Sequence, residues 1–128
     1  MPLHHLEDLE VWKRSSRLAV SILELIEPVK LHALRDQMAR SCISVPSNVA
    51  EGAERESNKE FRRFLAIAKG SVGELRTQLY IGLAAGVFTN EAAMPLIHEA
   101  REIGSMLEGL RKRLVGPGIV NKLLSVFF

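Results

Sequence analysis

The sequence predicts an all-α protein that folds as an antiparallel up-and-down four-helix bundle. Four segments carry apolar residues at the three- and four-residue spacing of an amphipathic helix, and the connections between them are short. Aromatic residues make up only 5% of the chain, which favours helices over the aromatic- and Val-rich strands of a β-sandwich. With 128 residues, 47% of them hydrophobic and 25% charged, the chain suits one globular domain with its own core.

The first helix, at about residues 8–27, is apolar over an unusually wide arc. It ends before Pro28, because a proline disfavours a helical residue ahead of it. Two apolar stripes run along it, with centres roughly 110° apart at 100° per residue. One stripe is Leu9, Trp12, Ser16, Ala19, Leu23 and Ile26, and the other is Val11, Ser15, Leu18, Ile22 and Leu25. A bundle helix needs one stripe, so the second predicts a contact with another subunit. The predicted interface residues are Val11, Trp12, Leu18, Ile22 and Leu25.

The second helix, at about residues 31–53, contains a proline. Its core seam is Leu34, Met38, Cys42, Val45 and Val49. Pro46 removes the hydrogen bond to the carbonyl of Cys42, but the seam keeps its phase, so we predict one helix kinked at Pro46 rather than two short helices. A polar row lies beside the seam and consists of Gln37, Ser41, Ser44 and Asn48. We interpret this row as structural, because such side chains hydrogen-bond to helix backbone; a small-ligand site is the alternative.

The third and fourth helices have clear start and stop signals. The third begins near Ser57, since residues 57–60 (SNKE) form a capping box, and it closes near Gly86. The fourth has Thr89 or Asn90 as its N-cap and should end at Gly116-Pro117-Gly118.

These helices divide the chain into a four-helix bundle at residues 6–115 and an apolar C-terminal tail at residues 116–128. The tail has six apolar residues on one helical face: Ile119, Val120, Leu123, Leu124, Phe127 and Phe128. Such a face favours docking over exposure to water. It docks either on its own bundle or on a neighbouring subunit.

A basic row on the third helix is the main candidate for a binding site. The net charge is only +2, so the position of the charges matters more than their sum. The row and its flanking residues are Arg55, Lys59, Arg62, Lys69, Arg76 and Tyr80. Four of the basic residues recur every seven positions, about 10 Å apart along the helix. A linear cationic track with an aromatic residue at its end suits nonspecific binding of RNA or DNA. The alternatives are solvated side chains paired with acidic neighbours, and a polar protein interface.

Small residues on the same helix indicate a close helix–helix approach. They are Ala66, Gly70, Gly73 and Thr77. Because glycine inside a helix costs about 1 kcal/mol relative to alanine, repeated glycines call for a packing reason. The approaching helix belongs either to the same chain or to another subunit.

No motif for catalysis or metal binding stands out. Metal sites in bundles use Glu-x-x-His on two helices, which the sequence lacks, and no two histidines are four residues apart. We therefore predict a protein without enzymatic activity, cofactor or metal. The single cysteine, Cys42, is a predicted core residue and favours a reducing compartment. The N-terminus lacks a signal-peptide pattern and no apolar run reaches about 18 residues, which predicts a cytoplasmic protein without membrane contact.

Several of these segments resemble a known family. They are LEVWKRSSRLA (residues 9–19), SVPSNVAEG (44–52), EFRRFLAIAKGSVGEL (60–75) with TQL after it (77–79), and EIGSMLEGLRKRL (102–114). Together they resemble, over roughly residues 6–115, the four-helix-bundle proteins encoded in intervening sequences of 23S ribosomal RNA genes. One departure from the family pattern is Arg76, which stands where the family usually has Glu. It makes the row more basic, and the row faces either outward or an acidic neighbour.

The resemblance implies a bacterial bundle that assembles as a ring-shaped homopentamer. The family is similar to the accessory protein of diversity-generating retroelements, a basic pentameric barrel that engages a reverse transcriptase and nucleic acid. For most members the function is unknown. We therefore predict a non-enzymatic homo-oligomer with a basic surface that binds nucleic acid nonspecifically. The alternative is a protein-interaction scaffold or adaptor without affinity for nucleic acid.

Overall fold

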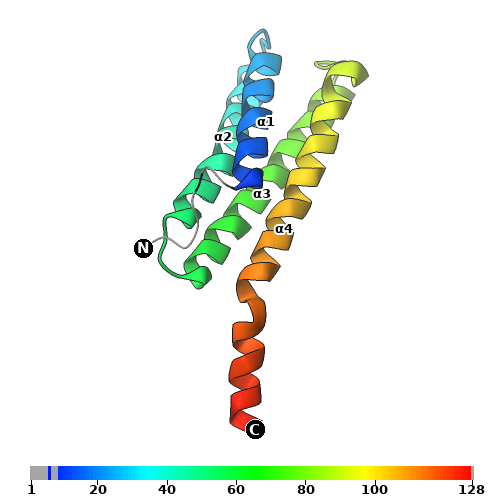
Figure 1. Cartoon of the computed structure of the whole chain (residues 1–128). Helices are drawn as coiled ribbons and strands as arrows, with labels where there is room; N and C mark the ends of the chain where they lie inside the picture. The colour runs from blue at the N-terminus through cyan, green and yellow to red at the C-terminus, as the bar shows by residue number, and fades with distance from the viewer. Residues whose placement is uncertain (1–5, 7–8, 128) are drawn as a thin grey trace.

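The computed structural model describes residue 6 and residues 9–127, with side chains up to residue 115. It contains the helices α1 (Glu10–Ile26), α2 (His32–Ala53), α3 (Asn58–Ala84) and α4 (Asn90–Phe127) (Figure 1). No strand occurs among these residues. The predicted all-α class is therefore confirmed.

The four helices pack in chain order around one core. α3 packs extensively on both α2 and α4, whereas α1 packs on α2 and less extensively on α4. Figure 1 shows the pair α1 and α2 facing the pair α3 and α4. These neighbours are those of an up-and-down bundle, in which each short connection returns the chain beside the helix before it.

The predicted capping box at the start of α3 forms one of its two hydrogen bonds. The hydroxyl of Ser57 accepts a hydrogen bond from the backbone N–H of Glu60 at 3.2 Å, which satisfies one free donor of the helix N-terminus. At the other end, Gly86 has a φ of 76°, and the N–H of Val87 donates to the carbonyl of Gly82 at 2.8 Å. Glycine adopts this left-handed conformation without strain, so α3 ends where the sequence predicted.

α2 runs without interruption through Pro46. The four seam residues Met38, Cys42, Val45 and Val49 are fully buried, so the apolar seam does keep its phase across the proline. One helix, rather than two, is therefore confirmed.

The wide apolar arc of α1 is mostly covered by the chain's own helices. Val11, Leu18 and Ile22 are buried in the core, while Trp12 and Leu25 are half-buried. Val11, Leu18 and Ile22 are therefore core residues with no surface left for a second subunit, whereas a subunit contact through Trp12 and Leu25 stays a prediction. Both stripes are used because α1 has a neighbouring helix on either side.

The predicted end of α4 at Gly116-Pro117-Gly118 is wrong, because α4 continues to Phe127. Figure 1 shows its last turns extending beyond the other three helices. A proline removes one backbone donor and each glycine costs about 1 kcal/mol, and these penalties weaken a helix without requiring it to stop. The side chains of residues 116–128 lie outside the described part, so the docking of the apolar tail stays a prediction.

Candidate nucleic-acid interface

Basic side chains line the seam between α3 and α4. Two shallow hollows lie along it, of about 380 and 210 Å³. The first is lined by Lys69, Val72, Gly73, Arg76, Arg101, Gly104, Ser105 and Glu108, and the second by Lys59, Glu60, Arg62, Arg63 and Arg111. We call these thirteen residues the basic groove. Seven of them are basic and two are acidic, so the groove carries a clear excess of positive charge.

The heptad spacing on α3 places three of the predicted residues in this groove. Arg62, Lys69 and Arg76 lie seven residues apart on the flank of α3 that faces α4. Seven residues advance a helix by about 10 Å and nearly two full turns, so the three side chains follow one line. The row therefore faces α4, which adds Arg101 and Arg111 to it and places one acidic neighbour, Glu108, against Lys69.

One acidic residue of the groove is shared between two cations. Lys69 Nζ donates to Glu108 Oε2 at 2.7 Å, and Arg111 Nε lies 3.5 Å from the same oxygen. The hydrogen bond from Lys69, helped by the charge of Arg111, lowers the pKa of Glu108. Similarly, Arg63 donates to Glu60 at 2.8 Å and lowers the pKa of that carboxyl. Exposed pairs of this kind are weak because solvent screens them, so these five residues can exchange partners.

Three arginines of the groove, Arg62, Arg76 and Arg101, form no ion pair with a described residue. Of these, Arg62 and Arg76 are half-buried. In each, the Nε atom is buried without a hydrogen-bond partner. An unmade hydrogen bond to a buried donor costs about 1–3 kcal/mol. These two guanidinium groups are therefore available to an anion that enters the groove.

Tyr80 lies at the end of the row, as predicted from its position in the sequence. Its side chain is 43% exposed, and Arg101 Nη2 lies 3.4 Å from its hydroxyl oxygen. The ring is thus held beside a cation at the end of the groove. Aromatic rings in this position stack on unpaired bases.

Arg55 does not continue the helical row, so its predicted placement is wrong, while its part in nucleic-acid binding stays a prediction. Arg55 lies in the turn between α2 and α3, before the N-cap Ser57, so helical periodicity does not apply to it. Its guanidinium pairs with Glu51 at 3.3 Å and lies over the ring of Phe64, 4.9 Å from the centroid. Lys59, in the first turn of α3, does line the groove.

The small residues of α3 have open space beside them, and one of them, Gly73, also lines the basic groove. A Cβ added at Gly70 or Gly73 would meet no atom within 4 Å, and Ala66 and Thr77 are exposed. No other described helix of this chain approaches them, so the same-chain explanation is wrong. The second alternative, a helix of another subunit, stays a prediction.

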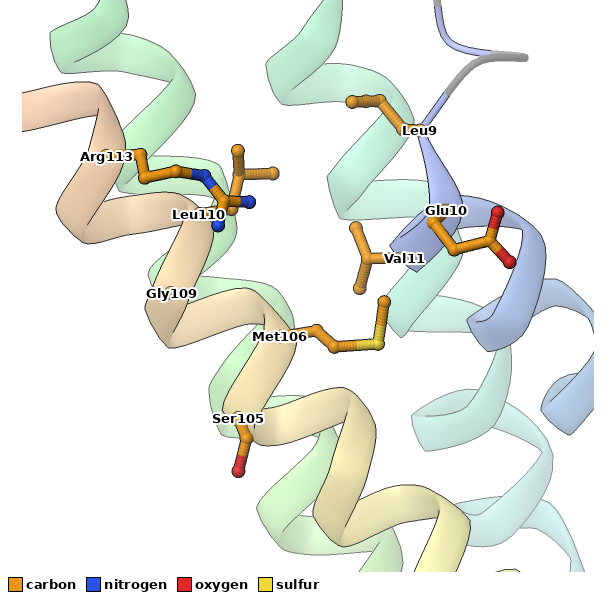
Figure 2. A pocket seen from close by; sticks show the side chains of 8 residues that line it. All are labelled: Leu9, Glu10, Val11, Ser105, Met106, Gly109, Leu110 and Arg113. Atoms are coloured by element: carbon orange, nitrogen blue, oxygen red, sulfur yellow. The ribbon is translucent and has the colours of Figure 1, made fainter.

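The seam between α1 and α4 is open at one end of the bundle. A pocket of about 400 Å³ there is lined by Leu9, Glu10, Val11, Ser105, Met106, Gly109, Leu110 and Arg113. Figure 2 shows the side chain of Met106 reaching from α4 toward Val11 on α1. Further along the seam, Arg14 donates to both carboxylate oxygens of Glu99, at 3.0 and 2.5 Å. The walls of this pocket are mainly apolar, so it does not extend the basic groove.

The described part of the chain contains no metal-binding cluster and no reactive thiol. No three His, Cys, Asp or Glu side chains lie close enough there to hold a metal ion. Burial raises the pKa of the Cys42 thiol to about 11, so it stays protonated and unreactive near neutral pH. None of the described helices is both long enough and apolar enough to cross a membrane.

The fold and the sequence were compared with those of known proteins. A protein of unknown function from the S23 ribosomal protein family of Bacteroides thetaiotaomicron has a similar crystal structure, with a TM-score of 0.76 and 24% identity over 80% of this chain and 98% of that one. At this identity the likeness shows a shared fold alone. No curated protein matches the chain. The family model of the 23S rRNA-intervening sequence protein matches residues 7–109. Because this match spans well over half of the sequence, the chain belongs to the 23S rRNA-intervening sequence protein family.

Proposed function

We propose that this protein is a non-enzymatic, cytoplasmic homo-oligomer that binds nucleic acid through the basic groove. One observation carries the proposal: seven basic and two acidic residues line one seam, and Arg62 and Arg76 lack acidic partners. Cations in a line bind the phosphate backbone, since each neutralised phosphate releases a counterion.

The groove is better suited to nonspecific binding of a single strand than to base-specific binding of a duplex. From Arg62 to Arg76 the track is about 21 Å long, at 1.5 Å per residue. No Asn or Gln, the side chains that read adenine edges, is among the lining residues, and the arginines there can pair with phosphates of any sequence. Tyr80 offers a stacking surface that accepts any base. We therefore expect nonspecific binding with a preference for unpaired RNA or DNA.

Assembly into a ring needs two different surfaces on each subunit, because a head-to-tail contact joins unlike patches. The outer edges of α1 and α2 carry exposed Val20, Leu23 and Ile43. The outer face of α3 carries the small residues around Gly70 and Gly73. In our proposal, the apolar edge of one subunit packs on the small-residue face of the next. The resemblance to the family suggests five subunits.

A salt titration tests the nucleic-acid proposal. Anisotropy of a labelled single-stranded RNA of about 20 nucleotides should fall with salt, with a log–log slope of about −0.7 per phosphate contacted. The variant Arg62→Glu/Lys69→Glu/Arg76→Glu should bind at least tenfold more weakly, with a slope smaller in magnitude by about 2.

The matched control is Lys13→Glu/Arg17→Glu/Lys30→Glu, which changes the net charge equally but lies outside the groove. It should bind nearly as the wild type does. A wild-type slope near zero, or an equal loss in the control, would reject the groove as the binding site.

A protein-interaction scaffold is the second candidate. The pocket between α1 and α4, with its mainly apolar walls (Figure 2), favours it, because apolar concavities accept side chains of partner helices. A partner of the reverse-transcriptase kind is the one suggested by the resemblance. The scaffold predicts a stoichiometric complex with one partner protein, lost on Gly109→Trp, and no affinity for RNA.

A further inference from the structure

Polar side chains gather in a hollow between α2 and α3, on the flank of α3 opposite the basic groove. The hollow is about 330 Å³ and is lined by Gln37, Arg40, Ser41, Ser44, Ser71, Glu74 and Gln78. We call it the serine hollow. Of the four polar residues that are buried in the described part of the chain, three line it: Ser41, Ser71 and Gln78. Burial of polar groups is costly unless each is hydrogen-bonded, so their concentration needs an explanation.

Hydrogen bonds within the bundle satisfy the serines. Ser44 Oγ and Ser71 Oγ are 2.8 Å apart and link α2 to α3. Ser44 also accepts from Asn48 Nδ2 at 3.0 Å, and Ser41 donates to the carbonyl of Gln37 at 2.9 Å. The polar row therefore has the structural role that the sequence suggested, but this role covers only part of the hollow.

These hydrogen bonds do not account for the burial of Gln78. Its side chain is only 8% exposed, and its Oε1 atom is buried without a hydrogen-bond partner. Leaving a buried acceptor unpaired costs about 1–3 kcal/mol, and an apolar residue of similar size would avoid that cost. The position suggests a hydrogen-bond donor that comes from outside the chain.

Two unpaired charges stand at the rim of the same hollow. Arg40 and Glu74 are exposed, and neither forms an ion pair with a described residue. A second hollow of about 560 Å³ shares Gln37, Glu74 and Gln78 with the first and continues over Gly73 and Thr77, at the border of the face proposed for a subunit contact. The two volumes lie in the range of small-molecule sites, about 300–1,000 Å³. The hollow thus offers one cation, one anion and one unpaired amide to a single small molecule.

We propose that the serine hollow binds a small zwitterion of the α-amino acid type. The ammonium group of such a ligand is a donor for the Glu74 carboxylate and for Gln78 Oε1. Its carboxylate is an acceptor for the Arg40 guanidinium and for the hydroxyl of Ser71. One ligand therefore pairs both rim charges and the buried amide at once, which neither a simple anion nor a simple cation does.

Calorimetry with L-glutamine as the probe tests the zwitterion requirement. L-Glutamine should bind and raise the melting temperature. N-acetyl-L-glutamine, which lacks the ammonium group, and glutamine α-amide, which lacks the carboxylate, should each bind at least tenfold more weakly. No binding at millimolar L-glutamine, or equal binding of all three, would overturn the proposal.

Three variants locate the site. Arg40→Gln and Glu74→Gln change exposed residues, so the fold should be unaffected while affinity falls at least tenfold. Gln78→Met should leave the ligand-free protein as stable as the wild type or more so, since it removes an unpaired amide, but should abolish the ligand-induced rise in melting temperature.

Two control variants on α1, Arg17→Gln and Glu24→Gln, carry the same charge changes and should bind as the wild type does. Loss of stability in Gln78→Met would mean that the amide has a structural partner, against the proposal. A change in the mass of the assembly in Glu74→Gln, with no effect on ligand binding, would identify the hollow as a subunit contact and also reject it as a ligand site.

Discussion

Replacing Gly70 and Gly73 by alanine would separate a role of these glycines inside α3 from a role between subunits. An added Cβ meets nothing within 4 Å at either position, so neither substitution should strain the isolated chain. Alanine is better than glycine in a helix interior by about 1 kcal/mol. The double variant should therefore be about 2 kcal/mol more stable as a monomer, which raises the melting temperature by about 7 °C for a domain of this size.

The same two methyl groups should weaken assembly. If the apolar edge of a neighbouring subunit packs directly on this face, the methyl groups overfill the contact, and overpacking costs about 1–3 kcal/mol. We therefore expect association to weaken by roughly ten- to a hundredfold, at 1.4 kcal/mol per factor of ten. Sedimentation over a range of protein concentrations measures the association, and denaturant unfolding at the lowest concentration measures the stability.

The control for this experiment is Gly109→Ala on α4. Its added Cβ would lie 3.9 Å from Arg113 Nη1, which is an ordinary contact, so it gains helix stability away from the proposed interface. A double variant that is more stable yet associates as the wild type does would refute the subunit contact on α3. A double variant that is less stable would refute the conclusion that this face is open.

Three further predictions concern single residues. Gly82→Ala should destabilise the fold by up to about 2 kcal/mol in urea unfolding, because its Cβ would lie 2.5 Å from Cδ2 of Phe88 and closer still to Cε2. The hydrogen bond from Lys69 lowers the pKa of Glu108 below its usual 4.5, so this pair stabilises the fold above that pH, and the stabilisation is lost as the pH falls through the lowered value. Glu108→Gln should therefore flatten the acid side of the stability curve. Cys42, with its pKa raised to about 11 by burial, should react with a maleimide far more slowly in the native protein than in urea.

Local signals in the sequence predicted most of the fold correctly. The hydroxyl of Ser57 caps α3 as expected, and the seam across Pro46 is buried in one helix. The stop at Gly116-Pro117-Gly118 failed because it was argued from the cost of three residues alone, and the helix-forming residues on both sides outweigh that cost. The assignment of Val11, Leu18 and Ile22 on α1 to a subunit interface failed for a different reason. Two apolar stripes do not distinguish a second subunit from two neighbours within the same bundle.

Only the α3 side of the basic groove could be predicted from the sequence. The spacing of Arg62, Lys69 and Arg76 follows from one helix, and so it could be predicted. Arg55 failed because the seven-residue period holds only inside a helix, and α3 begins after it. The groove residues of α4 are Arg101, Glu108 and Arg111, which lie 25 to 49 positions after the α3 residues Arg62, Lys69 and Arg76. Only the packing of α3 on α4 could bring them into the groove.

The central position of α3 gives one short chain room for the two proposed binding sites and the proposed subunit contact. α3 packs extensively on two neighbours, with Leu65, Leu75 and Leu79 fully buried, so its remaining flanks are held rigidly. The flank toward α4 carries the arginines, the flank toward α2 carries Gln78, and the outer face carries Gly70. Because a helix exposes a different flank every 100°, substitutions only two residues apart on α3 should affect different properties. Arg76→Glu should weaken RNA binding and leave amino-acid binding intact, whereas Gln78→Met should do the reverse; a single substitution that abolished both would show that the two sites are not independent.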